Sequence, residues 1–531
     1  MPGDALIDGY SIPDGSCDEL LERDGTPKAH VASLVATLRR LGPQALMDAG
    51  RRRDAIFMQQ GITFEVSGSD GERRDRPFPL DLVPRILTAT EWTVIKRGLA
   101  QRIRALNAFV DDVYHGREIV RAGLVPWSLI VSRPSFARAV HGVRAPGGVY
   151  THVSGCDLVR GGDSIWRVLE DNVRTPSGIS YVLENRLAMT RLVPELFAGH
   201  RVRPVDNYPS LLLEALQAVA PGVESEPTVV LWTPGPLNSA YFEHAFLARE
   251  MGIELVEASD LVVRDATCYM RTTAGLQRVH TIYRRLDDDF IDPLDFRADS
   301  VLGVPGLVRA YRAGTVAIAN AIGTGVADDK AVYHYVPEMI RFYLEEEPIL
   351  ENVPTYLLSN DKLRKWVLGR LNELVVKPTS ESGGKDVFIG PQASAAELEQ
   401  QARLIEAHAE RFIAQELVHL STVPTETGDG HLAPRHVDLR PFAVFGEEIR
   451  IVPGGLTRVA LREGSMIVNS SQGGGSKDTW VLDDGASPDL VLPAVAPRKP
   501  PRLPDIRYGG WHGQAQQQQQ QQAALGPPAS R

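Results

Sequence analysis

The feature that most constrains the fold of this chain is an alternation of helix and strand patterns between residues 210 and 265. A helical pattern (LLLEALQAV) leads to a strand pattern (TVVLWT), and a second helix (AYFEHAFLAREMG) leads to a second strand (IELVEA). Helices and strands that alternate at this spacing are typical of a parallel sheet. Gly252 is well placed to follow the end of the second helix. We therefore predict a parallel α/β unit within a larger α/β (α+β) chain.

The overall composition is that of a globular enzyme and argues against several other classes of protein. The chain has 531 residues, of which 43% are hydrophobic, and 57 basic against 67 acidic residues give a net charge of −10. A protein that mainly holds nucleic acid usually has a basic excess, so we expect no nucleic-acid partner. Cys17, Cys156 and Cys268 are far apart, which argues against a disulfide framework or a cysteine zinc site and fits a reducing compartment.

The termini and the hydropathy pattern indicate where the chain resides. The first residues (MPGDALIDGYSIPDG) lack a basic leader followed by an apolar core, so we expect no secretory signal. No stretch approaches the roughly 20 apolar residues that span a bilayer. The expected location is therefore the cytoplasm, with no membrane partner. The final segment, from about residue 485, is rich in proline and glutamine, and we predict that it is disordered.

Other segments predict elements around the α/β unit. Residues 91–115 have the spacing of an amphipathic helix with Thr90 as its N-cap, and residues 149–172 read as two strands around the turn Gly161-Gly162-Asp163. Ser394 and Glu397 form a capping box at the start of another helix. Further predictions are a helical stretch over 328–346 interrupted by Pro337, strands at 374–378, 387–389 and 412–418, and antiparallel strands over 437–480.

Asp157, Glu170 and Asn172 form the first candidate site. Glu170 and Asn172 are two residues apart in an extended segment, so their side chains point to the same face. Asp157 lies on the partner strand of the predicted hairpin, near the same end. Two carboxylates and an amide oxygen are ligands that Mg²⁺ prefers. The alternative is a solvated strand edge, which spacing alone favours because Glu-x-Asn is a common tripeptide.

Two lysines and a glycine-containing loop form the second candidate site. Lys377 ends an apolar strand and is followed by the loop TSESGGKD, residues 379–386, in which Ser382, Gly383 and Gly384 allow backbone N–H groups to approach an anion. The loop does not fit the P-loop pattern and joins two strands, as a flap over a nucleotide would. The alternative is an ordinary hairpin, although a buried lysine needs a partner. Lys330, after two aspartates, reads by itself as a surface lysine at a helix start.

Polar residues in two later strands could also bind a ligand. The segment AQELV, residues 414–418, has a Gln-Glu pair inside an apolar strand whose edge could offer backbone groups to an adenine ring. The alternative is an edge strand with its polar side in solvent. Arg440 and Arg458 lie in the antiparallel region, and arginines suit planar recognition of carboxylate or phosphate.

Taken together, these segments resemble the circularly permuted ATP-grasp family, type 2, over residues 140–482. The stretches that carry the resemblance include GVYTHVSGCDLVRGGDSIWRVLEDNVRTPSGISYVLENR, VVKPTSESGGKDVFIG, FIAQELV and RPFAVFGEEIRIVPGG. The Glu-x-Asn motif precedes the lysines here, as a circular permutation requires. A more distant similarity is to the synthetase domain of glutathionylspermidine synthase, whose Glu-x-Asn motif is followed by Ser/Thr-Pro-Ser/Thr, as it is here in Thr175-Pro176-Ser177.

The resemblance implies a circularly permuted ATP-grasp fold with a Rossmann-like preATP-grasp unit, and ATP and Mg²⁺ as ligands. It assigns Asp157, Glu170 and Asn172 to magnesium, Lys330 and Lys377 to the phosphates, and Ser382, Gly383 and Gly384 to the flap. It assigns Gln415, Glu416 and Leu417 to the adenine pocket, with Arg174, Arg440 and Arg458 as candidates for stabilising an acyl phosphate or binding a substrate carboxylate. The distant family has an arginine two residues before its aspartate, where this chain has Gly155; Arg160 and Arg174 are candidate substitutes.

The resemblance implies an ADP-forming ligase that joins a small-molecule or peptide carboxylate to an amine through an acyl phosphate. Family members are often encoded beside an α-helical protein, a possible partner. The alternatives are a non-catalytic nucleotide-binding scaffold subunit and an ATP-grasp phosphotransferase. The expected divisions are an N-terminal extension (1–90, partly ordered), a permuted segment with the metal ligands (91–205), the preATP-grasp-like unit (206–325), the nucleotide-binding subdomains (326–484) and the disordered tail (485–531).

Overall fold

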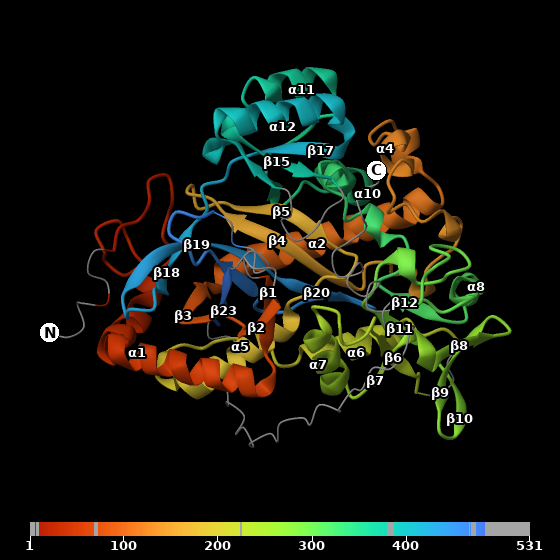
Figure 1. Cartoon of the computed structure of the whole chain (residues 1–531), viewed down its shortest axis with the longest axis horizontal. Helices are drawn as coiled ribbons and strands as arrows, with labels where there is room; N and C mark the ends of the chain where they lie inside the picture. The colour runs from red at the N-terminus through yellow and green to blue at the C-terminus, as the bar shows by residue number, and fades with distance from the viewer. Residues whose placement is uncertain are drawn as a thin grey trace.

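A ten-stranded sheet forms the centre of the protein. The structure is a computed structural model that describes residues 6, 10–67, 73–222, 226–379, 387–466, 468 and 474–483. Seven strands follow the order β13-β5-β4-β19-β22-β23-β3, while β18 pairs with β19, and β20 pairs with β4 and β21. Figure 1 shows this sheet across the middle of the molecule. Its strands are β3 (Leu80–Leu87), β4 (Val153–Arg160), β5 (Trp166–Asn172), β13 (Glu351–Asn352), β18 (Thr422–Glu426), β19 (Leu432–Arg440), β20 (Phe442–Phe445), β21 (Ile449–Ile451), β22 (Leu456–Val459) and β23 (Gly475–Val481).

The β4–β5 hairpin confirms the two strands predicted around the Gly161-Gly162-Asp163 turn. The strands are antiparallel, with Asp157 opposite Glu170 and Gly155 opposite Asn172. Because alternate residues of a strand face the same side of the sheet, this register places the three predicted magnesium ligands together. The antiparallel strands predicted over 437–480 are also present, although β23 additionally pairs in parallel with β3.

The predicted parallel α/β unit is confirmed. Strands β6 (Val229–Trp232), β7 (Glu254–Val256), β11 (Thr281–Arg284) and β12 (Ala317–Ala319) form a parallel sheet in the order β12-β11-β6-β7. Gly252 caps the helix before β7 with a left-handed φ of 69°. The remaining elements of this unit are α6 (Tyr208–Ala218), α7 (Tyr241–Met251), α8 (Leu307–Arg312) and the antiparallel strands β8 (Leu261–Arg264), β9 (Thr267–Thr272) and β10 (Gly275–Arg278).

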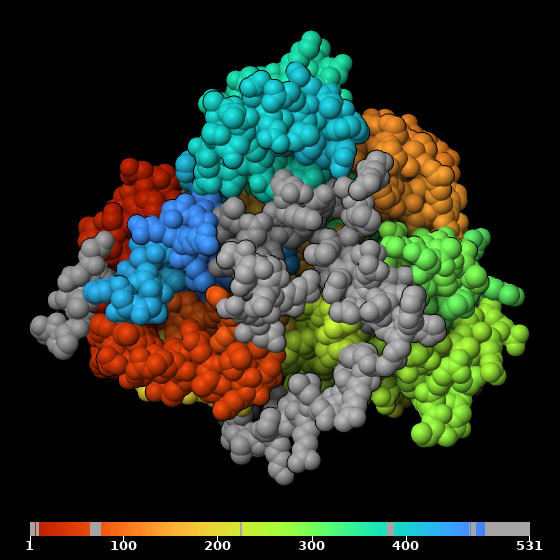
Figure 2. All heavy atoms as spheres, viewed as in Figure 1, coloured from red at the N-terminus to blue at the C-terminus, as the bar shows by residue number. Residues whose placement is uncertain are grey.

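A second, smaller sheet lies above the central one. Figures 1 and 2 show it as a separate lobe at the top of the molecule; we call residues 355–416 the upper subdomain. Its strand order is β14-β17-β15-β16, all antiparallel. The elements are β14 (Thr355–Leu357), α11 (Asp361–Leu368), β15 (Leu374–Pro378), β16 (Phe388–Ile389), α12 (Ala395–Ala407) and β17 (Phe412–Glu416). The pairing of β15 with β16 confirms that the loop after Lys377 joins two strands.

The N-terminal region is integrated into the body by buried polar contacts. Arg85 on β3 forms an ion pair with Glu19 at 2.6 Å, both side chains are fully buried, and Arg85 also donates to the Asp438 carbonyl at 2.8 Å. These contacts of Arg85 therefore connect the N-terminal region to β19, the strand that carries Asp438 and Arg440. The other elements of this region are α1 (Ala32–Gln60), β1 (Thr63–Ser67) and β2 (Arg73–Pro77).

The helices follow the sequence pattern with shifts at their ends. Helix α2 (Ala89–Tyr114) begins after Thr88 and not after Thr90, because Thr88 and Glu91 form a complete capping box. The 328–346 stretch divides into α9 (Lys330–Tyr333) and α10 (Val336–Leu344), and Pro337 lies in the first turn of α10, where a missing N–H is tolerated. The capping box of Ser394 and Glu397 is confirmed. The remaining helices are α3 (Glu118–Arg121), α4 (Trp127–Val131) and α5 (Ile179–Leu192). In the described ranges, no helix has the length and apolar character needed to cross a membrane.

The turn of the β4–β5 hairpin packs so closely on the N-terminal segment that we predict a cost for any side chain at Gly162. A Cβ atom there would lie 1.8 Å from the Gly15 carbonyl oxygen. Gly162→Ala is therefore expected to lower the free energy of unfolding by about 1–3 kcal/mol, measured by urea denaturation. Gly50→Ala is the control, because a Cβ at this helical position has only the end of Arg53 at 4.0 Å. Equal stability of the two variants would contradict the prediction.

Candidate active site

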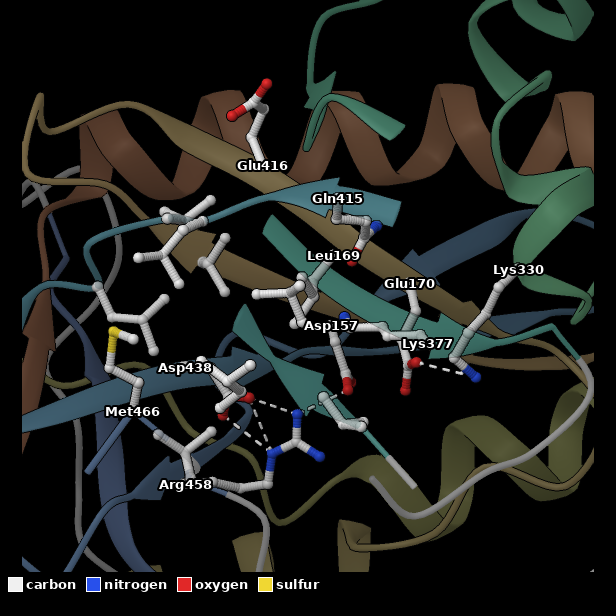
Figure 3. Close-up of a pocket in the computed structure, with 18 of the residues that line it drawn as sticks. Asp157, Leu169, Glu170, Lys330, Lys377, Gln415, Glu416, Asp438, Arg458 and Met466 are labelled. Carbon is white, nitrogen blue, oxygen red and sulfur yellow. Dashed lines mark hydrogen bonds and ion pairs between the residues drawn. The ribbon is translucent and has the colours of Figure 1, made fainter. Parts of the chain in front are cut away.

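A cavity of about 170 Å³ lies between the upper subdomain and the central sheet (Figure 3). Strands β4, β5, β19 and β22 contribute to its floor, strands β15 and β17 to its roof, and the start of α9 to one side. Its lining residues are Asp157, Val159, Leu169, Glu170, Lys330, Val375, Lys377, Pro378, Val387, Ile389, Gln415, Glu416, Leu417, Val418, Leu420, Asp438, Arg458, Met466 and Val468.

The cavity is apolar at one end and charged at the other. Figure 3 shows Met466 among aliphatic side chains at one end, while Glu170, Lys330 and Lys377 meet at the other. An apolar slot suits a planar base, and a cluster of cations suits phosphate groups. The cavity therefore offers an apolar surface to a planar base and cations to phosphate groups, the two parts of a nucleoside triphosphate.

Glu170 is surrounded by positive charge. Its carboxylate is 3.4 Å from Lys330 Nζ and 3.9 Å from Arg440 Nη2. Burial by itself raises the pKa of Glu170, but the positive charges of the surrounding residues together outweigh burial and hold the pKa well below its usual range; these residues are Lys330, Lys377, Arg440 and Arg458. Glu170 is therefore ionised at neutral pH, which is the state in which a carboxylate binds a metal ion.

Asp157 is held by two arginines. Arg440 donates to both carboxylate oxygens of Asp157 at 2.5 and 2.8 Å, and Arg458 donates to one of them at 2.6 Å. Arg458 also binds Asp438 through its Nε at 2.9 Å. The side chain of Asp157 is 1% exposed, so its charge is neutralised by these arginines and not by water. Its assignment to magnesium stays a prediction, as do the substrate-binding roles of Arg440 and Arg458.

The donor set fits a magnesium ion that keeps phosphate and water ligands. Asn172 donates from Nδ2 to the Gly155 carbonyl at 3.0 Å and so has its amide oriented by the neighbouring strand. Among the described residues, no group of three or more His, Cys, Asp or Glu side chains could hold a metal by itself. Mg²⁺ is usually held by one or two carboxylates together with substrate phosphates, so Glu170 with the Asn172 amide oxygen is an adequate protein contribution.

Lys377 projects from β15 into the charged end of the cavity. Burial lowers the pKa of Lys377 to about 8, with Glu170 opposing this shift and Lys330 adding to it. The ammonium group therefore loses its proton within the range of ordinary assays, unlike a solvent-exposed lysine.

We predict that affinity for a non-hydrolysable ATP analogue falls as the pH rises through about 8. Above this pH, the free protein must take up a proton at Lys377 before the ammonium can pair with phosphate. The measurement is calorimetry between about pH 7.5 and about pH 9.5, and Lys377→Arg should flatten the profile because arginine stays charged. The same fall in both proteins would refute the role of Lys377.

The effect of Lys377 on the stability of the apoprotein has the opposite sign. The unfolded chain holds this proton up to about pH 10.4, so Lys377 makes the free energy of unfolding rise with pH between about 8 and about 10.4.

The strand predicted to meet adenine contributes to the apolar half of the cavity. Gln415, Glu416 and Leu417 all line the cavity, but the Glu416 carboxylate points away from it (Figure 3) and accepts a hydrogen bond from the Tyr356 hydroxyl at 2.7 Å. The buried Gln415 amide donates to Thr355 at 3.0 Å, and its Oε1 has no hydrogen-bond partner among the described residues. The Oε1 atom of Gln415 is thus available to accept a hydrogen bond from a ligand in the cavity.

The remaining predicted site residues lie apart from the cavity lining or outside the described residues. Arg174 is 3.3 Å from Asp287 and 3.3 Å from Asp328, carboxylates that follow β11 and precede α9. Ser382, Gly383 and Gly384 lie outside the described residues, so their predicted flap role stays a prediction.

Comparison with known proteins identifies the family of this chain. The family described as circularly permuted ATP-grasp type 2 matches residues 84–460 of the chain. The chain belongs to this family. It is 52% identical over 492 residues to an uncharacterized protein of Mycobacterium tuberculosis H37Rv, covering 91% of this chain and 88% of that protein. It is 46% identical over 467 residues to a Frankia alni protein with the provisional name glutamate–cysteine ligase 2-3, covering 87% of this chain but only 53% of that protein.

A solved structure has a fold similar to that of this chain. It is an apo glutathione synthetase-like effector from Globodera pallida, with a TM-score of 0.57 at 11% sequence identity, covering 83% of this chain and 97% of that chain. At this identity, the likeness concerns the fold. It agrees with the predicted circularly permuted ATP-grasp fold and its Rossmann-like unit, which the sheets described above form.

At the charged end of the cavity, the Arg440 side chain lies next to Gly155, the position at which this chain departs from the distantly related family. A Cβ at Gly155 would lie 3.3 Å from Arg440 Cδ and 3.1 Å from Pro176 Cβ. Glycine therefore leaves space that the Arg440 side chain passes through on its way to Asp157. Arg160, one of the substitutes considered from sequence, instead pairs with Glu91 at 3.1 Å.

Sequence reasoning missed two residues of the site. Asp438 is two positions before Arg440 on β19, so the two-residue period of a strand could have placed both on one face. Asn320 gave no such signal: its buried amide donates to the carbonyls of Val153 and Val173 at 2.7 and 2.8 Å and accepts from the Val153 N–H at 2.7 Å. Asn320 follows β12, so the Rossmann-like unit holds the ends of the hairpin that carries Glu170.

Proposed function

We propose that this protein is an ATP-dependent carboxylate–amine ligase that forms an amide bond through an acyl phosphate and releases ADP and phosphate. The observation that carries the proposal is the cavity between the two sheets, with an apolar end and with Glu170, Lys330 and Lys377 at its charged end. A family whose fold is built to hold ATP across such a cavity provides the context.

The charged end has the groups that phosphoryl transfer needs. Glu170 and Asn172 would hold Mg²⁺, which when bound supplies Lewis-acid stabilisation of phosphate charge. Lys330 and Lys377 would pair with the phosphate oxygens as the negative charge shifts during transfer. These fixed charges lie in a partly buried cavity, where they act more strongly than in water.

Arg440 is the side chain that we assign to the reacting carboxylate. It takes the space left by Gly155 and lies 3.9 Å from Glu170, at the charged end. A guanidinium binds a carboxylate or an acyl phosphate through two parallel hydrogen bonds. Asp157 would keep Arg440 and Arg458 in place until the substrate arrives.

The reaction divides a difficult step into two easier ones. A substrate carboxylate oxygen attacks the γ-phosphorus of ATP, the bond to the β,γ-bridging oxygen breaks, and ADP leaves. The amine nitrogen then attacks the carbonyl carbon of the acyl phosphate, phosphate leaves, and the nitrogen loses a proton. Positioned cations and exclusion of water from the cavity favour amide formation over hydrolysis.

The relatives support a ligase at the level of their names. The Frankia alni protein has the provisional name of a glutamate–cysteine ligase, an amide-forming activity, although the match covers 53% of its length. The solved neighbour is described as glutathione synthetase-like. Both names concern amide bonds between amino acids, so peptides and amino acids are the first substrate class that we propose.

The test is a hydroxylamine trap, because it does not require the amine to be known. Purified protein is incubated with ATP, Mg²⁺, hydroxylamine and pools of amino acids or short peptides, and both ADP and hydroxamate are measured. Formation of both, dependent on a carboxylate pool, is expected. A stable phosphorylated product without hydroxamate would indicate a phosphotransferase. Binding of an ATP analogue without any ADP, in every pool, would refute the ligase and favour a scaffold subunit.

A further inference from the structure

Arg133 connects the upper subdomain to the rest of the described chain, close to the segments that carry Lys330 and Lys377. It follows α4, which lies beside the upper subdomain in Figure 1. Its Nη1 donates to the Thr379 hydroxyl at 3.0 Å and to the Glu410 carbonyl at 3.2 Å, and its Nε lies 3.3 Å from Asp329 Oδ2. One guanidinium thus contacts two segments of the upper subdomain and one of the body.

Two of the three contacts of Arg133 are close in sequence to a lysine of the cavity. Thr379 is two residues after Lys377 and directly follows the last residue of β15. Asp329 immediately precedes Lys330 and is the N-cap of α9, accepting hydrogen bonds from the N–H groups of Ala331 and Val332. The Lys330 N–H also donates to the Thr379 carbonyl at 3.1 Å. The arginine therefore fastens the joint at which the two lysine-bearing segments meet.

The ion pair between Arg133 and Asp329 is shielded from solvent. The side chain of Arg133 is 11% exposed and that of Asp329 is 3% exposed, so their ion pair is largely shielded from solvent. Burial raises the pKa of Asp329, and Arg133 opposes this shift and favours the charged carboxylate. Arg133 is not among the described residues that line the cavity, so its contacts place it behind the lysines.

We propose that Arg133 is a positioning residue that sets the spacing between Lys330 and Lys377 across the joint of the two subdomains. This inference rests on the proposed function only in so far as both lysines bind phosphate. Loss of Arg133 leaves the adenine end of the cavity intact but lets the two ammonium groups move apart. A displacement of about 1 Å in such an arrangement costs roughly 100-fold in rate.

The experiment compares four single variants and one double variant by three measurements. Arg133→Ala removes the bridge, Arg133→Lys keeps the charge without the fork, and Asp329→Asn removes the ion pair but keeps a good N-cap. Arg138→Ala, an exposed arginine five residues away, is the matched control. The measurements are ADP formation, affinity for a non-hydrolysable ATP analogue, and affinity for adenosine, which lacks phosphates.

A positioning role has a distinct signature in these data. Arg133→Ala is expected to lower turnover by about 10- to 100-fold and to weaken the ATP analogue while leaving adenosine affinity unchanged, with Arg133→Lys in between. The double variant Arg133→Ala/Asp329→Asn should be no worse than Arg133→Ala, because both changes break the same contact. Turnover and analogue affinity of Arg133→Ala within twofold of the Arg138→Ala control would overturn the proposal, and so would equal loss of adenosine and analogue affinity.

Failure of the proposed function would be seen separately. If wild-type protein forms no ADP, the ligase is refuted, but the ratio of analogue to adenosine affinity still decides the role of Arg133. If wild-type protein is active and this ratio does not change in Arg133→Ala, the ligase stands and the positioning role is refuted.

Discussion

Glu170→Gln is expected to lower ADP formation by about two to three orders of magnitude, the largest loss of activity among the changes considered for this protein. The amide is nearly the same shape but has no charge to hold Mg²⁺ or to balance Lys330, which lies 3.4 Å away. A ligand that binds the folded state raises its melting temperature by mass action. Mg²⁺ with an ATP analogue should therefore raise the melting temperature of the wild-type protein but not that of Glu170→Gln.

Two comparisons make the Glu170 result interpretable. Glu399→Gln, on the exposed face of α12 where the carboxylate is 70% exposed, controls for loss of one negative charge and should leave activity unchanged. Excess Mg²⁺ should restore part of the activity of Glu170→Gln if metal binding is the defect. Turnover of Glu170→Gln within threefold of wild type would remove Glu170 from the metal site.

Asp157→Ala is expected to give the largest loss of stability, about 3–5 kcal/mol in the free energy of unfolding. Asp157 is 1% exposed and accepts hydrogen bonds from Arg440 and Arg458, whose side chains are 15% and 9% exposed, so its removal leaves these two guanidinium groups with one carboxylate fewer. Arg458 retains Asp438, whereas Arg440 loses its bidentate partner. The measurement is urea denaturation of the apoprotein, together with its melting temperature.

The matched control is Asp163→Ala in the turn of the same hairpin. Asp163 pairs with Arg167 at 2.7 Å, but its side chain is 47% exposed, so its loss should cost about 0–1 kcal/mol. If both variants lose the same free energy of unfolding, burial does not determine how much the ion pairs of Asp157 contribute to stability. If Asp157→Ala is as stable as wild type, the arginines do not depend on it, and a direct metal-binding role for Asp157 gains support.

The local pattern of the sequence predicted most of the elements that carry the site. The two-residue period placed Glu170 and Asn172 on one face, and the glycine turn at 161–163 predicted the hairpin that brings Asp157 opposite Glu170. An apolar strand ending in a lysine predicted β15. These features depend on backbone geometry over a few residues, which side-chain type constrains directly.

The partners of the site residues could not be predicted in the same way. Nothing near Arg440 indicates that it binds Asp157, which is 283 residues earlier in the chain. The path of Arg440 past Gly155 is a matter of free space between strands β4 and β19, and free space depends on how strands from distant segments pack. The ends of α2 and β17 also differed from the predictions, because a capping box at Thr88 and the pairing with β14 and β15 set the actual limits.

The sequence by itself determined the family, the alternation of elements and the residue types at the predicted metal and phosphate positions. These follow from local periodicity and from motifs whose chemistry requires particular side chains. Only the tertiary structure decided that Glu170 lies among lysines and an arginine and that Asp157 forms ion pairs with two arginines. It also decided that Arg133 contacts the segments of both Lys330 and Lys377. Each of these depends on charges that meet across the joints between sheets, and the energy of a buried charge is set by distance and burial, which no short stretch of sequence contains.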